Sequence, residues 1–244
     1  KNHANPSLRS GQALKVKPML AGRALRAQRE NIMNITLRRE AVSDYRCVEE
    51  LTREAFWNLY VPGCSEHFLA HCMRKHEDFI RDLDYVALID GKVIGNIMYT
   101  RSHVISEEKH ILNTLTFGPV SVLPEYQRKG IGSLLIEKTI LEAKQNDEKA
   151  IIIFGSPKNY CKFGFKSCKD FNVSTVDGKY PYALLVLELV EGQLKDHKWE
   201  YHDSEVYNVE MEAVEEFDKG FVYKEKEYCY TQEEFKISCR AVIE

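Results

Sequence analysis

Residues 123–138, LPEYQRKGIGSLLIEK, decide the fold class of this chain. The stretch follows a strand-like run, and its apolar spacing predicts a helix over residues 126–144. Two basic residues and two glycines open that helix, although glycine is a poor helix former. Glycine lets a ligand approach the backbone closely, and a helix N-terminus offers unpaired N–H groups to anions. The stretch therefore predicts a site for an anionic ligand.

Phosphate is the anion that such a helix start binds above all others. The predicted phosphate-binding residues are Gln127, Arg128, Lys129, Gly130, Ile131, Gly132 and Ser133. A Walker A loop is excluded, because the chain has no GxxxxGK[ST] run. A dinucleotide fingerprint is excluded too, because Leu135 stands where GxGxxG requires its third glycine. One structural alternative stays open, in which the glycines only ease a tight junction between strand and helix.

The strand before this helix carries Gly118-Pro119 at a place where a central strand should be continuous. Proline removes a backbone donor and glycine marks bulges or close approach, so we expect the strand to splay from its neighbour. Splaying leaves backbone groups of Val120, Ser121 and Val122 without partners. An extended ligand with amide groups can pair with them as an added strand does. A ligand with a pyrophosphate at one end and a peptide-like arm at the other is coenzyme A.

The remaining pattern of strands and helices predicts an α/β domain around a mixed sheet. Asp90-Gly91 between two apolar runs is a strong hairpin signal. In chain order we expect a strand at 35–39, helices at 43–60 and 64–75, strands at 85–90, 93–100 and 110–124, a helix at 126–144, a strand at 150–154, a short helix and turn at 158–165, a strand at 182–190, and a strand followed by a helix within 206–221.

Composition divides the chain into three parts. Residues 1–32 carry seven Lys/Arg and one acid, and we expect a leader or tag with Met33 as the natural start. An organelle transit peptide and a basic helix remain the alternatives. Residues 33–190 form the expected domain. Residues 191–244 form an acidic extension packed on or near it, with 15 acids against seven Lys/Arg.

The same composition excludes several classes of protein. The acidic body argues against a nucleic-acid binder, which needs a basic footprint. No apolar run reaches the roughly 18 to 20 residues that span a bilayer. Seven cysteines without a CxxC pair favour a reduced chain over a disulfide framework. We therefore expect a cytoplasmic protein that binds neither nucleic acid nor membrane.

Two segments together resemble the GNAT superfamily of N-acetyltransferases. Residues 117–136, FGPVSVLPEYQRKGIGSLLI, resemble its central motif, Arg/Gln-x-x-Gly-x-Gly/Ala after a V-x-V-x-P strand end. Gln127, Gly130 and Gly132 occupy the three defining positions of that motif. Residues 155–165, GSPKNYCKFGF, resemble the tyrosine-bearing helix and GF turn that follow the next strand. The resemblance implies a mostly antiparallel mixed sheet, splayed between its fourth and fifth strands and flanked by helices.

The resemblance also implies a reaction, in which acetyl-CoA donates its acetyl group to a primary amine by direct attack in a ternary complex. The oxyanion would be stabilised by a backbone N–H, which we assign to Val120, and the thiolate would be protonated by Tyr160. Asn159 is expected to orient the thioester or the cofactor arm, with a capping role equally open. A non-catalytic acyl-CoA-binding sensor of the same fold is the alternative.

The acceptor pocket of such folds is usually walled by the first two helices and their connection, here FWNLYVPGCSEHFLAHC at residues 56–72. We expect Trp57, Tyr60 and His67 to line it, with core packing of the two aromatic residues as the alternative. Cys64, His67 and His71 share one helix face and are ligand types that zinc uses. Because neither HExxH nor a zinc knuckle is present, we expect no metal.

The sequence names no general base for the reaction. His103, Glu107 and Glu108 lie near the third and fourth strands, where we expect them at the surface. In the superfamily a water chain can deliver the proton instead. The resemblance implies a small-molecule or peptide amine as the partner, and a homodimer is compatible with the sequence.

Overall fold

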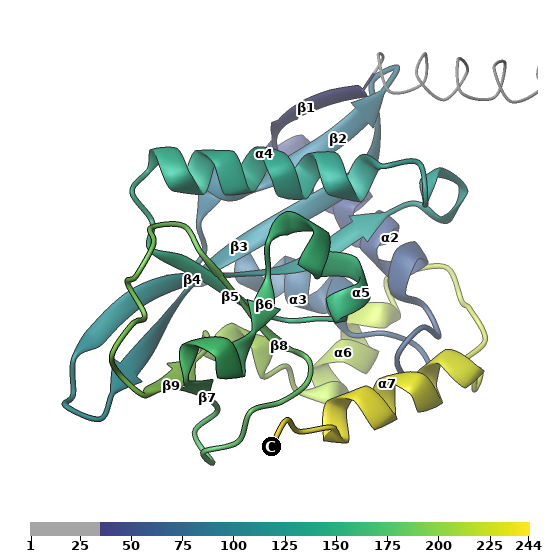
Figure 1. Ribbon diagram of the computed structural model, residues 1–244. Coiled ribbons are helices and arrows are strands. Elements are labelled where there is room, and N and C mark those ends of the chain that lie inside the picture. The colour runs from purple at the N-terminus through teal and green to yellow at the C-terminus, as the bar shows by residue number, and fades with distance from the viewer. Residues whose placement is uncertain (1–34) are drawn as a thin grey trace, which may run out of the picture. The chain divides into compact units, whose positions relative to one another are not determined.

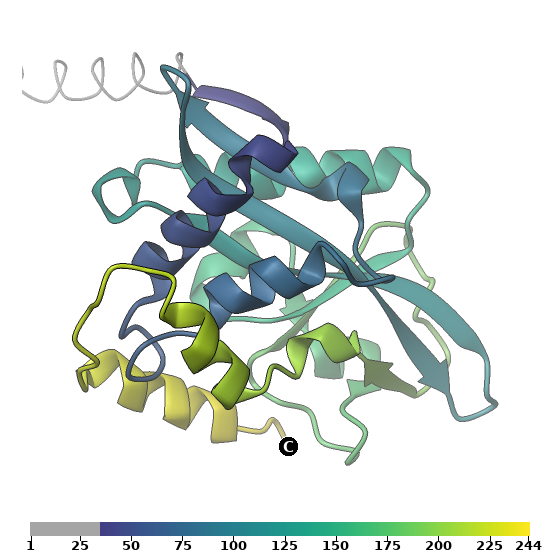
Figure 2. The same cartoon turned by 180° about the vertical axis from the view of Figure 1, so that it is seen from behind.

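The computed structural model describes residues 35–244, which form a mixed sheet with helices on both faces (Figures 1 and 2). The strands are β1 (Ile35–Arg39), β2 (Tyr85–Ile89), β3 (Lys92–Ser106), β4 (Ile111–Val122), β5 (Ala150–Phe154), β6 (Lys166–Ser167), β7 (Val173–Ser174), β8 (Leu184–Glu188) and β9 (Trp199–His202). The helices are α2 (Tyr45–Phe56), α3 (Glu66–Met73), α4 (Ile131–Gln145), α5 (Pro157–Tyr160), α6 (Met211–Asp218) and α7 (Tyr230–Arg240). The predictions for residues 1–32 lie outside the described residues.

The sheet runs in the order β1-β2-β3-β4-β5-β8-β6, and β9 joins it by pairing with β3 and β7. Helix α4 covers one face, where its Ile131 and Leu135 pack with Ile97, Tyr99 and other apolar side chains of β2–β5. Helices α2 and α3 cover the opposite face (Figure 2). Strand residues alternate between the two faces, so each face receives its own apolar layer.

Strands β4 and β5 part soon after they meet, as the sequence predicts. They run parallel and share the Cα pair Leu115↔Ile151 as their recorded register within the described residues. Beyond it, β4 stays paired with β3 as far as Val122, and β5 stays paired with β8 as far as Phe154. The β3–β4 register shifts between Ile97 and Tyr99, opposite the Gly-Pro step. The fold class, including the splay between the fourth and fifth strands, is confirmed.

Several expected elements differ from the structure: β3 continues to Ser106 and does not end at residue 100, and α2 ends at Phe56 and not at residue 60. Helix α4 begins at Ile131 and not at residue 126, because Arg128 (φ 59°) and Gly130 (φ 89°) adopt left-handed backbone conformations that end any earlier helix. A short 3-10 turn, Pro124–Tyr126, precedes them. The strand expected within 206–221 is wrong, since the strand of this region is β9. The hairpin at Asp90-Gly91 is present, with positive φ at both residues.

The acidic extension, residues 191–244, contributes to the sheet and to the helical layer behind it. Its strand β9 pairs antiparallel with residues 103–106 of β3. Helix α7 is followed by a bridge between Val242 and Pro181. Across residues 35–244, no helix combines the length and the apolar character that a membrane crossing requires.

Candidate cofactor and acceptor site

The start of α4 is a loop of backbone N–H groups, which we call the anion cradle (residues 127–133). Gly130 is the N-cap of α4, and its φ of 89° requires the left-handed region that glycine adopts without cost. The Gln127 side chain donates its Nε2–H to the carbonyl oxygen of Val122 at 3.0 Å, which ties the loop to the end of β4. The predicted cofactor residue Gln127 therefore shapes the cradle through its side chain.

The cradle leaves its backbone donors open. In the part of the chain that the structure describes, none of the N–H groups of residues 128–133 meets an acceptor, whereas the Leu134 N–H bonds to the Gly130 carbonyl. Basic residues lie in and beside the loop, since Arg128 and Lys129 belong to it and Lys162 Nζ lies 2.9 Å from Ser133 Oγ. Unpaired N–H groups and positive charge together fit a pyrophosphate. Sequence reasoning missed Lys162, whose position beside the turn after α5 gave no separate signal.

The two glycines of the cradle have different reasons to be glycine. A Cβ at Gly130 would meet no described residue within 4 Å, so its positive φ is the internal reason for glycine there. A Cβ at Gly132 would lie 3.8 Å from Val122 Cγ2, which is an ordinary contact. The fold itself therefore does not require glycine at position 132. Close approach by a ligand does supply a reason.

The end of β4 beside the gap offers backbone groups and few free side chains. Ser121 is buried and donates its hydroxyl to Thr52 Oγ1 of α2 at 3.1 Å, so its side chain is engaged on the face opposite α4. Val120 and Val122 are partly buried against the α4 layer. All three predicted residues thus lie where β4 has left β5, and what they can offer to a ligand is the backbone edge that faces away from β3.

Tyr160 is the last residue of α5 and lies on the α4 face of the sheet, across the gap between β4 and β5. Its ring packs 5.7 Å from the Phe117 ring of β4, and a Cβ at Gly155, just after β5, would lie 2.4 Å from its Cε2 atom. Gly155 is therefore required for Tyr160 to lie over the backbone. Burial, with a contribution from Tyr60, raises the pKa of the Tyr160 phenol to about 12. Its neighbour Asn159 is exposed, and its backbone N–H bonds to the Ser156 carbonyl.

Comparison with protein families identifies this arrangement. A family model described as the acetyltransferase (GNAT) domain matches residues 82–167, which contain β3, β4, the anion cradle, α4, β5 and α5. Residues 82–167 are therefore similar to a GNAT domain. Over 87 residues the chain is 30% identical to the uncharacterized N-acetyltransferase YjhQ of Escherichia coli K12. This match covers 35% of the chain and 47% of YjhQ, about half of that relative's length.

Solved structures extend the likeness beyond the GNAT domain. The GNAT family N-acetyltransferase YhbS from Escherichia coli, in complex with CoA, aligns with a TM-score of 0.62 and 21% identity over 72% of this chain and 93% of YhbS. A GNAT family acetyltransferase from Brucella melitensis, in complex with acetyl-CoA, aligns with a TM-score of 0.56 and 21% identity. This alignment covers 71% of this chain and 97% of the Brucella protein. At these identities the likeness establishes a shared fold.

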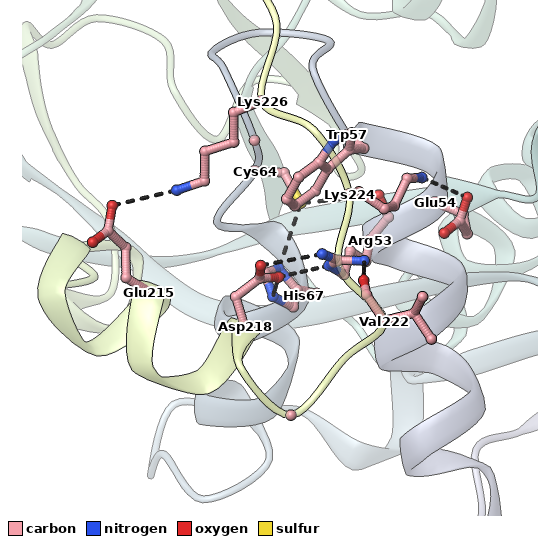
Figure 3. Close-up of polar contacts among 12 residues, drawn as sticks. Arg53, Glu54, Trp57, Cys64, His67, Glu215, Asp218, Val222, Lys224 and Lys226 are labelled. Carbon is pink, nitrogen blue, oxygen red and sulfur yellow. Dashed lines mark hydrogen bonds and ion pairs between the residues drawn. The ribbon is translucent and has the colours of Figure 1, made fainter.

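The predicted acceptor residues lie under the acidic extension, and Figure 3 shows two of them, Trp57 and His67. Trp57 donates its indole N–H to the Glu225 carbonyl at 2.8 Å, and the Tyr60 ring stacks on Phe235 of α7 at 4.6 Å. His67 is fully buried, with Nε2 3.2 Å from Asp218 of α6. The structure therefore brings these three residues to one corner, but it pairs them with the extension, and His67 has no surface to offer an acceptor.

The same corner does not gather the zinc ligands that the sequence suggested as an alternative. Cys64 Sγ lies 3.4 Å from His67 Nδ1, whereas His71 Nδ1 faces Glu49 Oε1 at 2.9 Å. Among residues 35–244, the group with the spacing of metal ligands lies elsewhere, around the β3–β4 turn, and consists of Glu108, His110 and His197. All seven cysteines are unpaired.

Proposed function

We propose that this chain is an acetyltransferase that moves an acetyl group from acetyl-CoA to a primary amine. One observation carries the proposal: the open N–H groups of the anion cradle lie at the end of the strand that has left its neighbour. A pyrophosphate needs the first feature, and an amide-bearing arm needs the second. The matched GNAT domain supports the same assignment, as do the CoA and acetyl-CoA complexes named for its structural neighbours.

We assign each residue a role that its unpaired N–H groups or its charge allow. The cradle N–H groups with Arg128, Lys129 and Lys162 hold the pyrophosphate, and the backbone of residues 120–122 pairs with the amide arm. A backbone N–H of the parted strand, which we assign to Val120, stabilises the oxyanion. The amine nitrogen forms a bond to the acetyl carbon while the carbon–sulfur bond breaks, and its electron pair leaves on sulfur.

Tyr160 is assigned to the leaving thiolate as a hydrogen-bond donor. Its pKa of about 12 lies well above the ~8.5 of a free thiol. Moving the phenol proton to the thiolate would therefore cost about 5 kcal/mol. A donated hydrogen bond incurs no such cost, and the proton that sulfur finally receives comes from the attacking nitrogen. We assign Asn159, exposed beside Tyr160, to the thioester or the cofactor arm.

A calorimetric titration of the full chain with acetyl-CoA, with coenzyme A and ATP as comparators, tests the proposal. We expect one-to-one binding of both coenzymes and none of ATP. Release of free thiol is then followed over a panel of small-molecule and peptide amines. Binding of acetyl-CoA without turnover of any amine would favour a sensor of the same fold. Absence of binding by a folded sample would contradict both functions. The homodimer remains a prediction, for which sedimentation is the check.

A further inference from the structure

Two adjoining cavities form a groove on the side of the sheet that carries β9. The first, of about 410 Å³, is lined by Phe154, Thr175, Val176, Asp177, Tyr201 and Asp203. The second, of about 610 Å³, shares Val176, Tyr201 and Asp203 with it and extends to Asp78, His103 and Glu205. Because the two share three lining residues, they are continuous. We call them the acidic groove.

The acidic groove begins where β4 and β5 part, on the face opposite the anion cradle. Ile151 and Ile153 of β5 pack in the α4 layer, and the alternate residues face β9. Phe154, the last residue of β5, is 52% exposed and lies 6.2 Å from the Tyr201 ring, centre to centre. The Tyr201 hydroxyl contacts Thr116 of β4.

A second tyrosine places the extension directly against the parted strand. The Tyr207 hydroxyl donates to the Gly118 carbonyl of β4 at 3.4 Å. Burial raises the pKa of Tyr201 and Tyr207, and in both cases the charge of Asp203 adds to the rise. Asp203 lines both cavities together with Tyr201, whose hydroxyl contacts Thr116 of β4.

The groove carries an excess of negative charge. Its lining includes four carboxylates, Asp78, Asp177, Asp203 and Glu205, of which Asp177 is paired with Lys179 at 2.5 Å. The Arg101 guanidinium also lines it, but that group is paired with Glu148 at 2.7 Å.

Two of these carboxylates are free to receive a ligand. Within the described residues, Asp203 and Glu205 form no hydrogen bond or ion pair with another side chain, whereas Asp78 accepts from Ser204 Oγ at 2.7 Å. His103 stacks on His202 at 5.0 Å, and burial together with that neighbour lowers its pKa. At neutral pH His103 therefore adds no positive charge.

On the basis of the proposed transferase function, we infer that the acidic groove binds the acceptor, and that the acceptor is an amine with at least one further positive charge. The reacting amine lies at the start of the groove, between Asp203 and the aromatic rings of Phe154 and Tyr201, which attract cations. The second charge lies farther along, towards Glu205 and Asp78. Donor and acceptor then approach the parted strands from opposite faces, so that both can be bound at once in a ternary complex.

The inference gives the extension a role in selecting the substrate. Tyr201, Asp203 and Glu205 all belong to residues 191–244. Amine selection would thus reside in β9 and the turn after it, outside the part of the chain that the GNAT family model matches.

The test compares 1,4-diaminobutane with n-butylamine, which has the same carbon chain and one charge less. With the full chain and saturating acetyl-CoA, we expect kcat/KM for the diamine to exceed that for the monoamine by about tenfold, and the ratio to fall as salt is added. D203N and E205Q should each bring the ratio down several-fold without changing the acetyl-CoA Kd. E210Q removes a charge from the same extension outside the groove, and it should leave the ratio unchanged.

Each other outcome is decisive. A diamine-to-monoamine ratio that survives both D203N and E205Q overturns the groove while the transferase function stands. If acetyl-CoA binds but no amine is turned over, the transferase function fails, and calorimetry with spermidine decides the groove. If the unaltered chain binds spermidine and D203N does not, the acidic groove is retained as a cation site. If the unaltered chain does not bind spermidine, the acidic groove is overturned.

Discussion

The two faces of the sheet leave their polar groups in opposite states near the parting of β4 and β5. On the α4 face, the N–H groups of residues 128–133 meet no acceptor within the described residues. On the other face, the α2–α3 corner is covered by the extension, which supplies hydrogen-bond acceptors to Arg53 and Trp57. Open groups indicate where a ligand must supply the partners, and paired groups indicate where the chain attaches to itself. Substitutions on the α4 face, which we call the open face, should therefore reduce binding or turnover. Substitutions on the opposite face, which we call the covered face, should reduce stability.

The largest effect is expected from Arg53→Met on the covered face. Arg53 is 3% exposed and donates two hydrogen bonds to the Asp218 carboxylate, at 2.6 and 3.1 Å, and one to the Val222 carbonyl at 3.0 Å (Figure 3). Its guanidinium also lies over the Trp57 ring. Removing one partner of such a buried pair should lower the free energy of unfolding by about 3–5 kcal/mol, measured by urea unfolding.

Lys224→Met is the matched control for that substitution. Lys224 pairs with Glu54 of the same helix as Arg53, at 2.7 Å, but both side chains are substantially exposed. An exposed pair contributes about 0–1 kcal/mol. Equal losses in the two variants would mean that Arg53 is not what holds the extension to α2. A preserved acetyl-CoA Kd in Arg53→Met would sharpen the contrast between the faces.

The second prediction concerns pH and His67. Burial lowers the pKa of this imidazole to about 4, against about 6.5 in an unfolded chain. Between these values the unfolded state binds a proton that the folded state does not. The free energy of unfolding should therefore fall by about 3 kcal/mol as the pH drops from 6.5 to 4, in addition to the acid response of other groups. In His67→Gln this part of the slope should vanish, and urea unfolding at several pH values measures it. An unchanged slope would contradict a neutral, buried His67.

The third prediction returns to the open face. Tyr160→Phe removes one hydroxyl and keeps the ring that packs on Phe117. Loss of a hydrogen bond to the departing thiolate should lower kcat by about 10²-fold. The acetyl-CoA Kd should stay within about twofold, since the cradle is untouched. Because the pKa of Tyr160 is raised to about 12, its ionisation should not limit the rate below about pH 11. A kcat equal to that of the unaltered chain would remove Tyr160 from the mechanism.

The open face could be predicted from the sequence because its signals are local. Gly118-Pro119 and the cradle glycines lie within 15 residues of one another, and each has a backbone meaning of its own. The helix start was misplaced by five residues, because a left-handed Arg128 is not visible in composition.

The covered face has no such local signal. Arg53 and Asp218 are 165 residues apart, and the sequence around either residue does not indicate that the two are paired. Trp57, Tyr60 and His67 were therefore assigned to an open pocket, although the extension supplies their partners. For the same reason the acidic groove, which joins β5 to the extension, went unforeseen.

The smallest expected effect tests whether Gly130 is needed only for its backbone conformation or also for ligand binding. Gly130 and Gly91 both have positive φ, 89° and 79°, and a Cβ at either would meet none of the residues 35–244 within 4 Å. Alanine at either position should therefore lower the free energy of unfolding by a similar amount, about 1–2 kcal/mol. Only Gly130→Ala places a methyl group at the mouth of the anion cradle, so only it should weaken acetyl-CoA binding, by about tenfold in calorimetry. If both variants bind acetyl-CoA like the unaltered chain, Gly130 serves the junction between strand and helix alone. The case for the open face would then rest on Gly132, for which the fold supplies no reason to be glycine.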